Sequence, residues 1–300
     1  MSATHEGFEK HERYAGAVSD VAGYESRVLR DADGVDIHVY AWHAASPRGI
    51  VHIAHGAGEH ALRWAPVAEA LVAAGYSVVA DDHRGHGRTG AGHLGLSMLG
   101  QGATRSAIDA LQLVGETARA EAGRLPLVIL GHSWGSLMAQ RIIARSSLYD
   151  GAVLSGTSLA VPGVINAGDL NRRWRAPGST GLEWLATDPA VADSFAADPY
   201  CFDIAARPVW TPLQTLAFLG RPPRHMPRRI PILIQGGTED SLGGPRGMRL
   251  LATAYRRRSG LEDVTLVLYQ DARHEIYNDV VRSQAIADLV AWLDARFAIG

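Results

Sequence analysis

Short apolar runs alternate with longer amphipathic stretches along most of this 300-residue chain. Apolar runs of about four to eight residues bounded by turn residues are typical of buried strands, whereas apolar positions three and four residues apart are typical of helices. This pattern predicts strands at residues 35–42, 49–54, 76–80, 127–130, 151–154, 230–235 and 264–269, and helices at residues 66–74, 102–122 and 282–297. Strands that alternate with helices predict an α/β fold with a mostly parallel, doubly wound sheet.

The alternation stops between about residues 159 and 227. This stretch is rich in aromatic residues, interrupted by prolines and glycines: Trp174, Trp184, Phe195, Tyr200, Phe202, Trp210 and Phe218. It is too poor in apolar residues to form a separate core, so it either packs against the sheet edge or forms a helical cap with an apolar channel. We expect the cap, and therefore a core at residues 1–158 and 228–300 with a cap insertion at residues 159–227.

Composition and charge exclude several classes of protein. The chain is 47% hydrophobic and long enough to bury a large core as one domain. Its net charge of −2 gives no electrostatic reason to expect nucleic acid or an anionic membrane as a partner. No apolar run approaches the ~18 residues of a membrane span, and from the polar residues at the start of the chain we expect no secretory signal. We expect a cytoplasmic protein without integral membrane contact, in which the single cysteine, Cys201, serves packing.

The most informative chemistry follows the predicted strand at residues 127–130. There the chain reads Gly131-His132-Ser133-Trp134-Gly135, and a helical pattern begins at Ser136. A Gly-x-Ser-x-Gly motif between a strand and a helix is typical of a nucleophile elbow, whose tight turn strains the serine backbone and exposes its hydroxyl. Glycine at the flanking positions avoids collisions in this turn. Ser133 is therefore the candidate nucleophile.

A serine nucleophile needs a general base, which follows the nucleophile and the acid along the chain in this type of fold. Of the two histidines after Ser133, His225 lies in a proline-rich basic connector, whereas His274 follows the last predicted strand by a short loop. We expect His274 to be the base and to titrate near the reference pKa of ~6.5.

Three carboxylates compete to orient this base. Asp240 and Glu239 lie in the loop after the strand at residues 230–235, where Asp240 has the Gly-x-x-Asp spacing from Gly237 and Glu239 is one residue short. Asp271 lies in the loop of the base itself. The loop after the preceding strand is the expected position of the acid, so Asp240 is favoured, with Glu239 and Asp271 as alternatives.

Acyl transfer also needs N–H donors for the charge that develops on the substrate oxygen. One expected donor is the backbone N–H of Trp134, directly after the candidate nucleophile. The second is expected in the glycine-rich loop that follows the strand at residues 49–54, where the backbone N–H of Ala57 is the candidate. In the same region Gly56 lets the backbone approach a substrate closely, and Glu59 and Arg63 are further candidate substrate-binding residues.

Taken in order, the motifs resemble the monoacylglycerol lipase and lysophospholipase group of S33-like serine hydrolases. The resemblance spans roughly residues 25 to 298 and rests on His55-Gly56-Ala57-Gly58-Glu59-His60, Asp82-His83-Arg84-Gly85-His86-Gly87, Gly131-His132-Ser133-Trp134-Gly135, Gly237-Thr238-Glu239-Asp240 and His274. It implies an α/β-hydrolase fold with a cap inserted after the sixth strand, and hydrolysis of mono-acyl esters without a cofactor. It also implies that Ser133, Asp240 and His274 form the catalytic triad and that Ala57 and Trp134 form the oxyanion hole.

Three departures from this group leave the substrate open. Trp134 stands where methionine is usual, and Ser136 replaces a glycine that often follows the elbow. Tyr277 stands where some of these lipases place a second histidine that holds the glycerol head, which makes Tyr277 a candidate substrate-binding residue. The expected partner is a small-molecule ester, with a monoacylglycerol or a lysophospholipid-like ester favoured.

Other functions remain to be separated. A non-catalytic binding module on the same fold should have lost a triad member, and all three are present. An esterase or amidase acting on a compact substrate, an aminopeptidase and an acyltransferase stay open because the fold alone cannot separate them.

No metal is expected: His52 and His55 are three residues apart, but His52 lies on a strand and should point away from His55. His83 and His86 are expected to brace the floor of the site through hydrogen bonds. The oligomeric state is not predicted.

Overall fold

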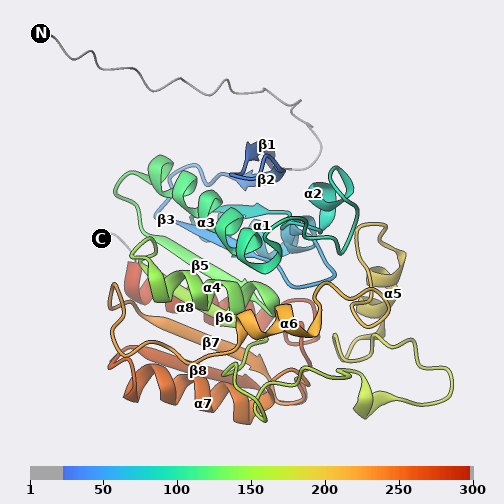
Figure 1. Cartoon of the computed structure of the whole chain (residues 1–300). Coiled ribbons are helices and arrows are strands. Elements are labelled where there is room, and N and C mark those ends of the chain that lie inside the picture. The colour runs from blue at the N-terminus through green and yellow to red at the C-terminus, as the bar shows by residue number, and fades with distance from the viewer. Residues whose placement is uncertain (1–22, 298–300) are drawn as a thin grey trace, which may run out of the picture.

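An eight-stranded sheet runs through the centre of the computed structural model, which describes residues 23–297 (Figure 1). Its strand order is β1-β2-β4-β3-β5-β6-β7-β8. The strands are β1 (Glu25–Arg30), β2 (Asp36–Trp42), β3 (Gly49–Ala54), β4 (Tyr76–Asp81), β5 (Leu127–His132), β6 (Gly151–Ser155), β7 (Ile232–Gly237) and β8 (Val264–Tyr269). β2 pairs antiparallel with both of its neighbours, and every other pair is parallel. The predicted mostly parallel α/β sheet is therefore confirmed.

Helices cover both faces of the sheet. One face packs against α3 (Ala103–Ala122), α4 (Trp134–Arg145) and α7 (Gly244–Arg257), and the other against α1 (Ala65–Ala73) and α8 (Arg282–Phe297). The central strands are apolar on both sides: in β5, Leu127 and Ile129 belong to the first layer, whereas Val128 and Leu130 belong to the second. None of the helices within residues 23–297 has the length and apolar character that crossing a membrane requires.

A long segment, residues 156–231, connects β6 to β7 and is here named the β6–β7 segment. It contains only short helices: η2 (Arg172–Trp174), α5 (Pro189–Ala197), α6 (Pro212–Thr215) and η3 (Leu216–Phe218). In Figure 1, α5 lies beside the end of the sheet where α2 (Gly87–Ala91) also lies. This segment includes the stretch that the sequence predicts to be a cap.

Several element ends differ from the prediction by one or two residues, and the short helices η1 (Ala61–Trp64) and α2 were not predicted. Three further differences concern longer elements. β1 was not predicted, and its presence makes β6 the sixth strand, as the resemblance implies. α7 was not predicted either. β7 begins at Ile232 instead of residue 230, because Pro231 has no N–H for the ladder and Ile232 donates the first bond, to Asp263 O.

Candidate active site

The candidate catalytic residues gather because parallel strands end at the same edge of the sheet. β5 ends directly before Ser133, β7 ends three residues before Asp240, and β8 ends five residues before His274. β3, the neighbour of β5, ends three residues before Ala57. Four segments far apart in the sequence therefore meet at the carboxyl ends of the strands, where ligands bind in open α/β sheets.

The turn at Ser133 has the strained backbone of a nucleophile elbow. Ser133 has φ of 51° and ψ of −118°, a conformation that L-residues rarely adopt. Its N–H donates to Ser155 O at 2.9 Å, which ties the turn to the end of β6. A side chain at Gly131 would come within 2.6 Å of Gly135 O, and one at Gly135 would collide with Ala54 O. The two glycines are therefore required by packing.

His274 and Asp240 form a buried pair. His274 Nδ1 lies 3.0 Å from Asp240 Oδ1, and both side chains are at most 1% exposed. Burial alone would lower the pKa of His274, but the facing Asp240 carboxylate outweighs it and raises this pKa above its usual value. Among the residues described, His274 Nε2 has no hydrogen-bond partner. One ring nitrogen is thus held by a carboxylate and the other is free for a reacting group.

The His274 ring is also fixed by packing. Its centroid lies 4.7 Å from that of His132, the residue before Ser133, and 4.8 Å from that of Trp184 in the β6–β7 segment. Gly156, with φ of +52°, leaves room for the ring, since a side chain there would come within 3.0 Å of His274 Cε1. These contacts connect the candidate base to the residue next to the candidate nucleophile.

The two alternative carboxylates lie elsewhere. Glu239 is partly exposed and pairs with Arg173 at the surface. Asp271 is exposed, and its carboxylate accepts a bond from Gln270 at 2.7 Å. Of the three carboxylates considered, only Asp240 is bonded to His274.

The two candidate oxyanion donors have unused N–H groups. Within residues 23–297, neither the Ala57 N–H nor the Trp134 N–H donates a hydrogen bond. Trp134 is the first residue of α4, where the N–H groups are left free by the helix and the dipole favours negative charge. The loop of Ala57 reaches the elbow, because a side chain at Gly56 would come within 3.2 Å of Ser133 Cβ. Both donors therefore belong to segments that contact Ser133.

Glu59 and Arg63 have partners inside the protein. Glu59 Oε1 accepts the Gly56 N–H at 2.6 Å, and Glu59 Oε2 accepts bonds from Arg63 at 2.9 Å and from Trp64 at 3.2 Å. Arg63 also makes two bonds of 2.9 Å to Glu275, the residue after the candidate base. Burial would raise the pKa of Glu275, but Arg63 lowers it to about 2. These contacts favour a positioning role for Glu59 and Arg63, and their binding of substrate stays a prediction.

Glu275 was not identified from the sequence. Arg63 and Glu275 are separated by 212 residues, and nothing in the local pattern around either one indicates the other. The pair holds the loop of Ala57 and the loop of His274 together.

Tyr277 lies in the core beneath the site. Its side chain is 3% exposed, its hydroxyl donates to Gln235 Oε1 at 2.5 Å, and its ring packs against Trp64 at 5.5 Å. Gln235 continues this chain of bonds to Tyr269 at 2.5 Å. The hydroxyl of Tyr277 is therefore bonded to another residue of the protein. No contact among the residues described supports its predicted role in holding a substrate, which stays a prediction.

A group of histidines supports the floor of the site, as expected. His83 Nδ1 bonds Asp81 Oδ2 at 2.7 Å, and His86 Nδ1 bonds Arg84 O at 2.9 Å. Both rings pack against the indole of Trp134, with centroids 5.4 and 5.0 Å away. Burial lowers the pKa of His86 to about 3, so this ring is neutral. A neutral His86 ring thus packs against the residue that follows Ser133.

Comparison with known proteins gives a consistent assignment. The sequence profile of a family described as "Serine aminopeptidase, S33" matches residues 45–280. The chain is 33% identical over 258 residues to a monoacylglycerol lipase of Mycolicibacterium smegmatis, which covers 82% of this chain and 88% of that protein. It is 29% identical over 286 residues to a monoglyceride lipase of Mus musculus, which covers 90% of each.

Solved structures support the fold. A carboxyl esterase from Bacillus coagulans in complex with glycerol superposes with a TM-score of 0.76 at 21% identity, covering 92% of this chain and 99% of that one. A soluble variant of the monoglyceride lipase from Saccharomyces cerevisiae, in complex with a substrate analog, has a TM-score of 0.74 at 20% identity, covering 96% of this chain and 100% of that one. With the sheet order described above, these similarities identify the fold as that of the α/β-hydrolases.

Proposed function

Because the chain belongs to the serine aminopeptidase S33 family of α/β-hydrolases and is a carboxylic ester hydrolase, we propose that it cleaves a mono-acyl ester through Ser133, His274 and Asp240. The observation that carries the choice of residues is the buried His274–Asp240 pair, whose free Nε2 belongs to a ring packed beside the strained turn at Ser133. The relatives named as monoacylglycerol or monoglyceride lipases supply the substrate class.

In the proposed reaction, His274 Nε2 takes the proton of Ser133 Oγ as this oxygen attacks the ester carbonyl carbon. Asp240 stabilises the resulting imidazolium at Nδ1, and the N–H groups of Ala57 and Trp134 stabilise the oxyanion of the tetrahedral intermediate. The intermediate collapses with loss of the alcohol, which receives the proton from His274. Water then attacks the acyl-enzyme by the same route in reverse and releases the carboxylic acid, which restores Ser133.

Apolar contacts of the β6–β7 segment support a substrate with an acyl chain. Leu182, Trp184, Leu185 and Phe195 form a buried apolar cluster of their own within this segment. Trp184 also packs on His274, so the cluster borders the candidate base. We infer that residues 159–227 act as the cap of a core formed by residues 23–158 and 228–297, and that the cap provides apolar walls for one acyl chain. The rest of the predicted core, residues 1–22 and 298–300, lies outside the described residues.

The nucleophile is tested with Ser133→Ala and a fluorophosphonate probe. We expect the variant to lose covalent labelling and to lower kcat by on the order of 10⁴-fold or more, because only binding and oxyanion stabilisation survive. Ser283→Ala is a matched control, since Ser283 is an exposed serine at the start of α8, and it should retain both properties. A Ser133→Ala enzyme that keeps labelling or a tenth of the activity would exclude Ser133 as the nucleophile.

The substrate is tested by measuring kcat/KM for p-nitrophenyl esters from C2 to C16, monoacylglycerols and aminoacyl amides. Each buried methylene contributes about 0.8 kcal/mol, so four extra carbons should raise kcat/KM by roughly two orders of magnitude up to a medium chain length. A flat profile, or one that peaks at acetyl esters, would show that the preferred substrate is a compact ester and not a lipid. A preference for the amides would instead support the aminopeptidase chemistry that the description of the family names.

A further inference from the structure

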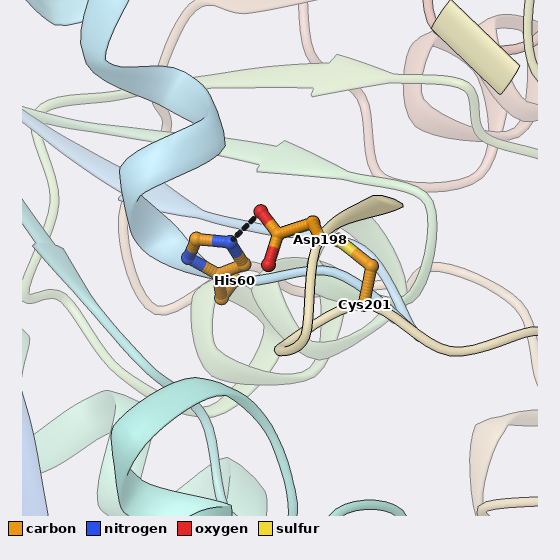
Figure 2. A group of neighbouring side chains, drawn as sticks. All are labelled: His60, Asp198 and Cys201. Carbon is orange, nitrogen blue, oxygen red and sulfur yellow. Dashed lines mark hydrogen bonds and ion pairs between the residues drawn. The ribbon is translucent and has the colours of Figure 1, made fainter. Parts of the chain in front are cut away.

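Three potential metal ligands meet outside the candidate triad. His60 follows the loop of Ala57, and Asp198 and Cys201 lie in the turn after α5; Figure 2 shows their side chains converging. One nitrogen of His60, one carboxylate oxygen of Asp198 and the sulfur of Cys201 lie within 4.8 Å of one another. His60 is 7% exposed, and the other two are half-buried. Cys201, which the sequence predicts to serve packing, therefore lies beside His60, the last residue of one of the motifs.

We propose that His60, Asp198 and Cys201 bind a borderline-soft divalent cation of the Zn²⁺ or Co²⁺ class. Imidazole nitrogen, thiolate sulfur and carboxylate oxygen are the ligand types of protein zinc sites, and three such ligands leave one position for water. With the thiol deprotonated, the site carries two negative charges opposite a doubly charged cation. The ligand set therefore matches the cation in type and in charge.

The geometry requires only small side-chain movements. Tetrahedral ligands at ~2.0–2.3 Å from Zn²⁺ are about 3.3–3.8 Å from one another. His60 Nε2 and Asp198 Oδ2 are now 2.8 Å apart and share a hydrogen bond, so they must separate by roughly half an ångström. Cys201 Sγ must approach them by roughly 1.5 Å at most, from the 4.8 Å limit of the cluster. The cation then takes the place of the proton between His60 and Asp198.

Binding of the cation is coupled to loss of the thiol proton. Burial raises the pKa of Cys201, nearby Asp198 adds to this effect, and Arg63 acts against it. The free protein thus holds the thiol protonated, and the cation must displace this proton.

The site would join two parts of the candidate active site. The turn after α5 already rests on the loop, since the Phe202 N–H donates to Gly58 O at 2.8 Å. A side chain at Gly58 would collide with Phe202 O, so the two backbones lie in direct contact. A cation bound by His60, Asp198 and Cys201 would thereby link the β6–β7 segment to the loop that carries Ala57.

The test is a titration of the full-length protein with Co²⁺, followed by its sulfur-to-cobalt charge-transfer absorption. The chain has one cysteine, so this band reports Cys201 alone. We expect one Co²⁺ per chain with this band, displacement of the band by Zn²⁺, and its loss in the nearly isosteric Cys201→Ser. Calorimetry with Zn²⁺ should give at least tenfold weaker binding for Cys201→Ser.

Two controls separate this site from others. His225→Ala removes an exposed histidine of the same β6–β7 segment and should bind Co²⁺ and Zn²⁺ as the wild type does. Ser133→Ala should also bind both cations normally, so the site is tested independently of the proposed esterase activity. Absence of the band in the wild type, or unchanged Zn²⁺ affinity in Cys201→Ser, would refute the proposed cation site. The cluster would then be a hydrogen-bonded His60–Asp198 pair beside a thiol.

Discussion

Replacing Asp240 with asparagine removes the charge that faces His274 and keeps the size of the side chain. The two groups lie 3.0 Å apart and are almost completely buried, so water does not screen the interaction. Opposite charges about 4 Å apart interact by about 4 kcal/mol at an effective dielectric constant of ~20, which corresponds to roughly a thousandfold in rate. The amide also lets the imidazole adopt the wrong tautomer. We expect Asp240→Asn to lower kcat by about 10³- to 10⁴-fold.

The neighbouring Glu239→Gln is the matched control. It makes the same chemical change one residue away, where the carboxylate pairs with Arg173 at the surface. We expect its kcat to stay within about twofold of the wild type, because surface ion pairs contribute little. The assay is steady-state hydrolysis of one p-nitrophenyl ester, with circular dichroism to verify folding. If Glu239→Gln had the large defect and Asp240→Asn the small one, the orienting acid would be Glu239.

The pH profile tests the same interaction independently. The base must be unprotonated, so activity falls as the pH drops through the pKa of His274. The Asp240 carboxylate raises this pKa above its ordinary value, although burial opposes it. The acid limb of kcat/KM should therefore have its midpoint above the ~6.5 expected from the sequence. It should move to lower pH in Asp240→Asn. A wild-type midpoint near pH 6, or no shift in the variant, would contradict the pairing.

Two further substitutions test the support of the site. Arg63→Met leaves Glu59 and Glu275 buried without their cation, so the free energy of unfolding in denaturant should fall by about 3–5 kcal/mol; Arg105→Met, at an exposed arginine on α3, should leave the denaturation midpoint unchanged. Gly237→Ala places a side chain against Ala272 O, between the loops of Asp240 and His274, and should lower both the thermal midpoint and kcat. Gly168→Ala, which meets only ordinary contact, should do neither.

The sequence predicted best those parts that are determined by local pattern. β3, β8 and α8 have the predicted bounds. The buried β3 has a largely apolar run, the edge strand β8 has an alternating pattern, and α8 has a long helical pattern. The turn at Ser133 was also predictable, because its glycines and its flanking elements follow from the chain itself.

The parts that were missed have different causes. β1 is an antiparallel edge strand with largely exposed, polar positions, so no apolar run marks it. α7 could have been found, since Met248, Leu251, Ala252 and Tyr255 are buried at helical spacing, although Gly244 and Pro245 obscure its beginning. Its basic residues further weaken the apolar pattern.

Side-chain partners within the site could not be predicted, because they come from distant segments. The resemblance implies a position in the pocket for Tyr277, yet its hydroxyl bonds Gln235 in β7. Arg63 and Glu59 lie in the motif-bearing region, but the partner that explains Arg63 is Glu275, next to the base. Sequence spacing predicts which loop a residue lies in, whereas the direction of its side chain depends on the packing of the whole fold.

The contacts of the β6–β7 segment imply that substrate binding and catalysis are coupled. Trp184 packs on His274, Trp210 lies 5.1 Å from Trp134, and the Phe202 N–H bonds the loop of Ala57 at Gly58. One segment therefore touches the candidate base, the residue after the candidate nucleophile and the loop of the second oxyanion donor. If the proposed acyl chain binds beneath this segment, it exchanges contacts with these aromatic rings, and its binding energy is then available to align the proposed triad. Binding energy from groups remote from the reacting bond is realised as rate when it is used for such alignment. Shortening the acyl chain should then lower kcat as well as raise KM, whereas a segment that only shields the site would change KM alone.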